Sequence, residues 1–189
     1  MNKITLYHGS PYLFDKFDLS GAGEGTGIKF GFGVYLTEVE ASAVHYSQPR
    51  NLELMPDHYL YTVEIPALTA DNHLGSALPV EPSIIKKVEK KLGVVVPDNV
   101  KTKGKEFRKW VGMTITGGKK AGFAEEKAAA ELLNSLGVLY NVWPQAQSKP
   151  DGPKNIAVFD AANVAIVKRE KIEIENKNKK WILVSKEVV

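Results

Sequence analysis

Three short segments of the chain carry side chains that could take part in chemistry. The first is His8, followed by Gly9 and Ser10, at the end of a β-rich run. An imidazole at a strand end can hydrogen-bond a sugar hydroxyl, and the glycine leaves its backbone N–H and C=O open to a small amide. Because a histidine followed by a glycine is more often an ordinary turn, this segment needs support from the other two.

The second segment, residues 31–46, places Tyr35 directly after a glycine-rich stretch and Tyr46 eleven residues later. Two rings brought together in this way can sandwich a flat heteroaromatic group, although either tyrosine alone would more simply be a packing residue. Residues 21–33 contain six glycines. This predicts a loop whose backbone can approach and close over a ligand.

The third segment, residues 155–164, reads as a strand, a turn and a strand. Asn155 begins the first strand, where its side chain can face a cleft. An amide can donate and accept hydrogen bonds but cannot act as a base. Asp160 is typical of a turn.

Alternating and helical hydrophobic patterns predict the elements that position these residues. Strands are expected over residues 4–7, 34–36, 59–65, 138–143, 155–159 and 164–168, with a C-terminal hairpin over 171–185. Helices are expected over 38–46, capped by Thr37 with Glu40, and over 83–92, 105–113 and 124–136. The pattern predicts one α+β domain over residues 1–189, with a mostly antiparallel sheet and a helical insert at about 67–123.

The amino-acid composition excludes several classes of protein and functional site. The 189 residues are 43% hydrophobic and contain no cysteine, which fits one globular domain and excludes disulfides, thiolate metal sites and a cysteine nucleophile. The four histidines have no ligand spacing with carboxylates, and no P-loop motif is present. We expect no metal. Without a signal-like or membrane-spanning apolar run, we also expect a cytoplasmic location and no membrane partner.

Positive charge is concentrated in the insert. Residues 81–123 hold eleven basic and four acidic residues, within a chain of net charge +3. Aromatic residues interleave the lysines, a composition suited to phosphate contacts and base stacking. The residues expected to bind a polyanion are Lys101, Lys103, Lys105 and Trp110, with Phe107 and Phe123 nearby. An ordinary solvated helical pair with inward-facing aromatics explains the same pattern equally well.

The order of the three segments resembles one enzyme family, the diphtheria-toxin and poly(ADP-ribose) polymerase branch of ADP-ribosyltransferases. Residues 31–46 resemble its Gly-x-Gly-[Ile/Val]-Tyr block with a second tyrosine eleven residues on. Residues 155–164 are similar to its Glu-Tyr-x-Val-[Tyr/Phe]-Asp-x-x-Gln-[Val/Ile] block, and residues 129–140 resemble ADP-ribosyltransferase domains of phage and mobile-element proteins. The resemblance covers most of residues 4–168 and fails over about 67–123.

The resemblance implies a fold of split sheets around a cleft for NAD, which serves as co-substrate. It implies a catalytic triad of His8, Tyr35 and Asn155, with Asn155 standing where the family has glutamate. His8 would hold a ribose hydroxyl, Gly9 would pair with the nicotinamide carboxamide, and Tyr35 and Tyr46 would stack on its ring. The residues expected to bind NAD are thus His8, Gly9, Ser10, Tyr35 and Tyr46.

Two departures qualify this expectation. Asn155 cannot act as a base, which favours transfer of a single ADP-ribose over polymer formation. Ala43 stands where the polymerases have a serine that contacts nicotinamide. We expect an intracellular toxin or effector that modifies a nucleic acid, RNA before DNA, and that could have an antitoxin or immunity protein. The alternatives are a protein acceptor, an NAD glycohydrolase toxin, and a catalytically degenerate NAD-binding module.

Overall fold

The computed structural model describes the chain except for residues 1, 21–27, 49–56 and 179. Its strands are β1 (Lys3–Ser10), β2 (Val34–Thr37), β3 (His58–Pro66), β4 (His73–Gly75), β5 (Tyr140–Pro144), β6 (Lys154–Val158), β7 (Ala165–Lys177) and β8 (Lys180–Val188). Its helices are α1 (Glu40–Tyr46), α2 (Pro82–Leu92), α3 (Asp98–Lys101), α4 (Gly104–Thr116) and α5 (Phe123–Ser135), with a 3₁₀ turn η1 (Ala161–Asn163).

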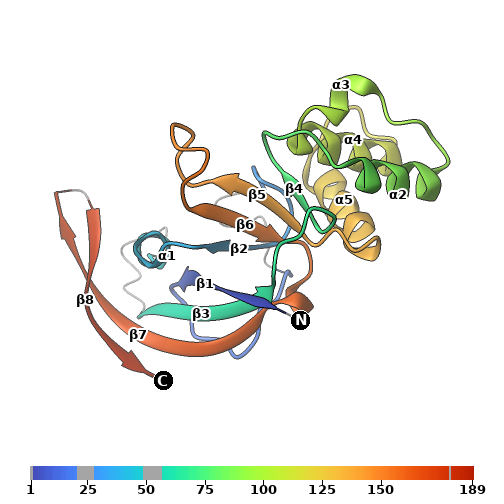
Figure 1. Ribbon diagram of the computed structural model, residues 1–189. Helices are drawn as coiled ribbons and strands as arrows, with labels where there is room; N and C mark the ends of the chain where they lie inside the picture. The colour runs from blue at the N-terminus through green and yellow to red at the C-terminus, as the bar shows by residue number, and fades with distance from the viewer. Residues whose placement is uncertain (1, 21–27, 49–56, 179) are drawn as a thin grey trace.

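The strands form one eight-stranded sheet in the order β4-β5-β6-β2-β1-β3-β7-β8 (Figure 1). Every neighbouring pair is antiparallel except β4 with β5. The α+β class and the mostly antiparallel sheet are confirmed. The strands do not separate into two sheets, but the junction of β1 with β2 is narrow, because it consists of the single registered pair Tyr7 with Thr37.

Different segments cover the two faces of the sheet. One face carries a core of alternating apolar residues from β1, β2, β3, β5 and β6, and partly buried residues such as Phe14, Phe17 and Leu19 pack against it. On the other face, Ala43 and Val44 of α1 pack against Leu60 of β3 and Ile172 of β7. Strand alternation produces this division, since successive side chains of a strand point to opposite faces.

The helical insert, together with α5, forms a separate core at one end of the sheet, beside β4 (Figure 1). Buried residues of α2, α4 and α5 form this core together with Phe32 and Phe159 from the ends of sheet strands. Helices α4 and α5 pack closely at Gly112, where a Cβ atom would lie 2.1 Å from the carbonyl oxygen of Glu125. The insert is thus anchored to the sheet through the segments that precede β2 and follow β6.

Several predicted boundaries are wrong, for local reasons. Helix α1 begins at Glu40 rather than residue 38, and Thr37 does not cap it; the Thr37 hydroxyl accepts the N–H of Val39 instead. The segment from His8 to Ser10 is part of β1, not a turn, because β3 pairs with it to its end. The strand expected over 164–168 and the first strand of the hairpin expected over 171–185 are one continuous strand, β7.

The other helices and the C-terminal hairpin are found close to their expected positions. Gly93 and Gly137, which follow the expected helices over 83–92 and 124–136, have left-handed backbone beyond the ends of α2 and α5. Helix α4 is longer than expected, and the short elements β4 and α3 were not predicted. Four of the six glycines in the stretch 21–33, at positions 21, 23, 25 and 27, lie outside the described residues.

Candidate functional site

Tyr35 and Asn155 lie on one face of two adjacent strands. Thr37 of β2 is registered with Asn155 of β6, so the side chains of this pair share a face. Tyr35 precedes Thr37 by two residues and therefore points to the same side. Strand β5 pairs with the other edge of β6, and its residue Trp143 is registered with Asn155. The side chain of Trp143 therefore lies on the same face of the sheet. Both Tyr35 and Asn155 are half-buried.

The hydroxyl of Tyr35 is held by the backbone just before β2. It donates to the carbonyl of Gly31 at 2.7 Å and accepts the N–H of Phe30 at 3.2 Å. Burial raises the pKa of Tyr35 above its ordinary value, while the Phe30 N–H and the Arg108 cation partly oppose the shift. The phenol therefore stays protonated near neutral pH. Gly31 has φ +108, which favours glycine, so this turn before β2 depends on the residue type.

Trp143 and Phe30 complete an aromatic wall beside Tyr35. The ring of Phe30 stacks on Trp143 with centroids 4.2 Å apart, and Tyr35 meets Trp143 edge-on at 5.6 Å. The carbonyl of Phe30 also accepts the amide N–H of Asn141 at 2.8 Å. Sequence reasoning missed both residues. The position of Trp143 at the end of the strand expected over 138–143 could have suggested a functional residue. The sequence does not show which strand pairs with that one.

The imidazole of His8 contacts the backbone of Tyr35 and not the aromatic ring of Tyr35. Its Nδ1 hydrogen-bonds the carbonyl oxygen of Tyr35 at 2.8 Å, across the junction where the β1–β2 pairing ends. Because a carbonyl only accepts, Nδ1 carries the proton and Nε2 of the neutral ring is an acceptor. Desolvation lowers the pKa of His8 below its ordinary value, and the bond to Tyr35 partly opposes this. The imidazole is therefore neutral at pH 7.

The pleat of β1 directs His8 to the face opposite Tyr35 and Asn155. Tyr7 is registered with Thr37, so the next residue, His8, belongs to the other face. Its ring is edge-on to Phe17 at 5.0 Å and to Phe14 at 6.2 Å. The three expected catalytic residues thus come from adjacent strands, but Tyr35 and Asn155 lie on one face of the sheet and His8 lies on the other.

The other residues expected to bind NAD have other contacts. Gly9 is buried under α1, where a Cβ atom would lie 1.8 Å from the carbonyl oxygen of Ala43. The hydroxyl of Ser10 accepts the N–H of Tyr12 at 3.0 Å. Tyr46 is 62% exposed at the end of α1 and lies edge-on to His45. The structure brings Tyr35 against Trp143, and does not bring Tyr35 and Tyr46 into contact.

The expected acceptor-binding residues lie on the insert. Lys103 and Lys105 flank the start of α4, and Lys101 at the end of α3 is ion-paired with Asp98. Trp110 is half-buried and packs against the insert core, and Phe107 is fully buried in that core. Phe107 is therefore unavailable for base stacking. The expectation of interleaved stacking rings is wrong at this position, since the helical period turns Phe107 inward.

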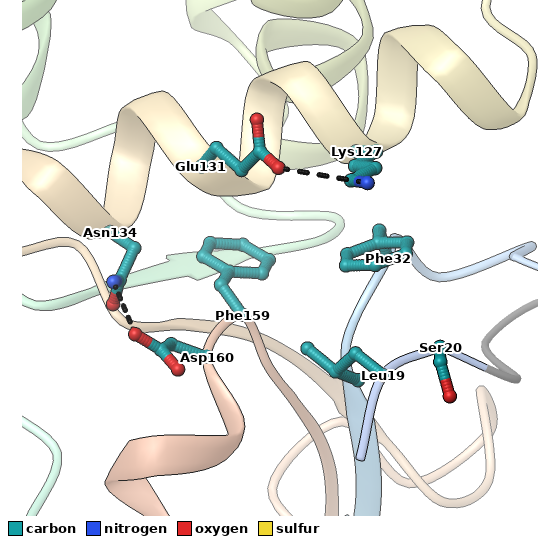
Figure 2. Close-up of a pocket in the computed structure, with 8 residues that line it drawn as sticks. All are labelled: Leu19, Ser20, Phe32, Lys127, Glu131, Asn134, Phe159 and Asp160. Carbon is teal, nitrogen blue, oxygen red and sulfur yellow. Dashed lines mark hydrogen bonds and ion pairs between the residues drawn. The ribbon is translucent and has the colours of Figure 1, made fainter.

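A cleft separates α5 from the strand ends below it (Figure 2). Its volume is about 340 Å³, near the lower end of small-molecule sites. The rings of Phe32 and Phe159 form its centre, while Lys127 and Glu131 extend from α5 above them (Figure 2). Asn134 donates to Asp160 at 3.1 Å, which joins the helix to the turn after β6.

No three side chains of His, Asp or Glu in the described ranges are grouped to hold a metal ion. Within the same ranges, no helix has the length and apolar character needed to cross a membrane. The candidate site consists of the residues on β1, β2 and β6 with their aromatic neighbours. No family model matches this chain, and neither does any curated protein or solved structure.

Proposed function

We propose that this chain is an NAD-dependent mono-ADP-ribosyltransferase. The observation that carries the proposal is that three motifs far apart in the sequence fold into three neighbouring strands, β6, β2 and β1. They bring Asn155 and Tyr35 to one face of the sheet, while His8, on the opposite face, hydrogen-bonds the backbone carbonyl of Tyr35. A ligand that must be held at a ribose and at a flat ring needs such a set of hydrogen-bonding and aromatic groups.

The arrangement supports specific roles for these residues toward NAD. The neutral His8 offers Nε2 as an acceptor for a ribose hydroxyl, since Nδ1 is engaged by Tyr35. Tyr35 offers a ring fixed by its hydroxyl, with Trp143 as its neighbour. Asn155 offers an amide that can orient the ribose. Cleavage of the glycosidic bond develops positive charge on this sugar, so orientation and dipoles there lower the barrier.

The proposed acceptor is a nucleic acid, with RNA favoured. Lys103 and Lys105 make no ion pair within the described part of the chain. The insert core includes Phe159, four residues after Asn155, which corresponds to about 13 Å along a strand. A macromolecule can span that distance. In this proposal the enzyme acts in the cytoplasm as a toxin or effector, and a cell that makes it needs an antitoxin or immunity protein.

The direct test is incubation of the purified protein with labelled NAD and a cell extract. Nicotinamide should be released, and label should become attached to a macromolecule that nuclease destroys and protease does not. Tyr35→Ala should lower NAD binding or turnover by about 1–3 kcal/mol, because it removes the fixed ring. A protein that neither binds NAD by calorimetry nor releases nicotinamide with any extract would contradict the proposal.

A second candidate is a non-catalytic module that binds NAD or ADP-ribose. The neutral Asn155 favours it, because a binding site needs no base. Calorimetric binding of NAD without nicotinamide release would support this module. Free ADP-ribose as the product would instead indicate an NAD glycohydrolase, and label on protein would indicate a protein acceptor. In cells, induced expression of an active transferase should arrest growth, and His8→Ala should relieve the arrest.

A further inference from the structure

Directly after β2, a carboxylate is hydrogen-bonded to the backbone of Lys154, the residue that precedes Asn155. Thr37 is registered with Asn155, and the next residue, Glu38, is hydrogen-bonded to Lys154 just beyond the registered pairs. The backbone N–H of Glu38 donates to the carbonyl of Lys154 at 3.0 Å. In return, the N–H of Lys154 donates to Oε2 of Glu38 at 2.7 Å. The side chain of Glu38 thus takes part in the bonding of the last rung between β2 and β6.

This arrangement fixes one carboxylate oxygen and leaves the other available. Among the described residues, Oε1 of Glu38 has no hydrogen bond, and Glu38 takes part in no ion pair. The ammonium of Lys154 donates to the carbonyl of Pro150 instead. Glu38 is exposed to solvent. Its carboxylate is therefore held in position, has no paired cation among the described residues, and is accessible to water.

We propose that Glu38 is the general base of the transfer reaction, in place of the base that Asn155 cannot provide. This inference rests on the proposed function. Glu38 is one residue beyond the Thr37–Asn155 pair, a step of about 3.3 Å along the strands. The carboxylate thus belongs to the same end of the β2–β6 seam as the amide that orients the ribose. Because Glu38 is exposed to solvent, its carboxylate can contact an acceptor that approaches from the solvent side.

The reaction balances with this base. A nucleophile of the acceptor, X–H, attacks C1′ of the nicotinamide ribose, so that an X–C1′ bond forms while the bond from C1′ to nicotinamide breaks. The electron pair of the broken bond goes to the ring nitrogen, and nicotinamide leaves neutral. The proton of X–H passes to the Glu38 carboxylate and from there to water. Asn155 orients the sugar and takes no proton.

The test uses the full chain with labelled NAD and an extract that contains both RNA and protein. Glu38→Gln keeps an oxygen that can accept the Lys154 N–H, so the rung and the thermal unfolding midpoint should be preserved. It removes the base, and transfer should fall by at least about 100-fold while the Kd for NAD stays within about threefold of wild type. Glu40→Gln is the matched control, since Glu40 is two residues away and pairs with Lys186.

A rescue variant separates a catalytic role from a structural one. Asn155→Glu in the Glu38→Gln background returns a carboxylate to the neighbouring position and should restore transfer to within about tenfold of wild type. Unimpaired transfer by Glu38→Gln in an active wild-type background overturns the role of Glu38 alone. A wild type that never releases nicotinamide overturns the proposed function and this inference with it.

Discussion

The hydroxyl of Tyr35 is hydrogen-bonded within the protein, whereas its ring is the part proposed to contact NAD. The stabilising role of the hydroxyl and the binding role of the ring can therefore be tested separately. Tyr35→Phe keeps the ring but leaves the Gly31 carbonyl and the Phe30 N–H without their partner. Loss of a hydrogen bond to part-buried groups costs about 1–3 kcal/mol. Urea unfolding should show this loss, while the Kd for NAD should be nearly unchanged. Tyr46→Phe, at an exposed tyrosine, is the control and should unfold like wild type; an equal loss in both variants would contradict the role of this contact.

His8 links stability to pH. Desolvation lowers its folded pKa below the ordinary value of 6.5, despite the opposing bond to Tyr35. The unfolded chain therefore takes up a proton at a higher pH than the folded chain. The contribution of neutral His8 is complete above the unfolded pKa and is lost as the pH falls through the folded pKa.

The corresponding experiment compares wild type with His8→Gln by urea unfolding at about pH 7.5 and about pH 5.5. The wild type should lose more unfolding free energy between these two values than His8→Gln does, because only the wild type must protonate a desolvated imidazole. His45→Gln changes an exposed histidine and should keep the wild-type difference. If His8→Gln retained the full acid dependence, the source of that dependence would have to be another group.

At the scale of elements, a buried ion pair joins the insert to the turn that holds Tyr35. Arg108 of α4 and Glu126 of α5 are paired and almost completely buried. A Cβ atom on Gly31 would lie 3.1 Å from the guanidinium, so the arginine packs directly against this glycine. Desolvation lowers the pKa of Arg108 to about 10, so it remains charged at neutral pH. Helix α4 thereby supports the segment that leads into β2.

Removing one partner of this pair should be more harmful than removing both. Arg108→Met leaves the Glu126 carboxylate buried without a cation, which should cost about 3–5 kcal/mol of unfolding free energy. The double variant Arg108→Met with Glu126→Leu removes both charges and should recover most of that loss. Urea unfolding measures both effects. Equal stability of the single and double variants would show that the pair does not hold Glu126 in its buried position.

These elements also show what the sequence can and cannot predict. Alternation and helical spacing locate most strands and helices, because burial of one face dictates the pattern. Arg108 lies in a lysine-rich run and was counted as part of the basic surface, yet Gly104, Arg108 and Gly112 recur every four residues on the buried side of α4. That spacing was a usable signal. No sequence pattern predicts the contact of Tyr35 with Trp143, because this contact depends on the pairing of strands that are distant in the sequence.

At the scale of the whole molecule, the basic insert and the pair Glu38 and Asn155 lie at different ends of the same two strands. The insert packs against Phe32 before β2 and Phe159 after β6. Glu38 and Asn155 lie at the opposite ends of these strands. An acceptor large enough to contact both regions would gain affinity from the lysines and reactivity from the site. This separation is the reason to expect that charge on the insert affects acceptor binding without affecting NAD.

Salt should therefore distinguish a nucleic-acid acceptor from a protein acceptor. Lysine–phosphate contacts release counterions, so labelling should fall steeply from low to moderate salt. Lys103→Glu with Lys105→Glu should reduce labelling and lower the slope of the salt dependence by about 1.5, since each lost phosphate contact removes about 0.7–0.9. Lys101→Glu should add less, because Lys101 is already paired with Asp98. The Kd for NAD should not change in any of these variants.

A matched control places the same charge change elsewhere. Lys177→Glu with Lys180→Glu alters two exposed lysines at the β7–β8 hairpin, at the other edge of the sheet from β4. Net charge falls equally in both double variants, so a general electrostatic effect would weaken labelling in both. Only a local lysine–phosphate contact weakens it in the insert variant alone. A labelled product that resists nuclease, disappears with protease and forms equally well at moderate salt would replace the nucleic acid with a protein acceptor.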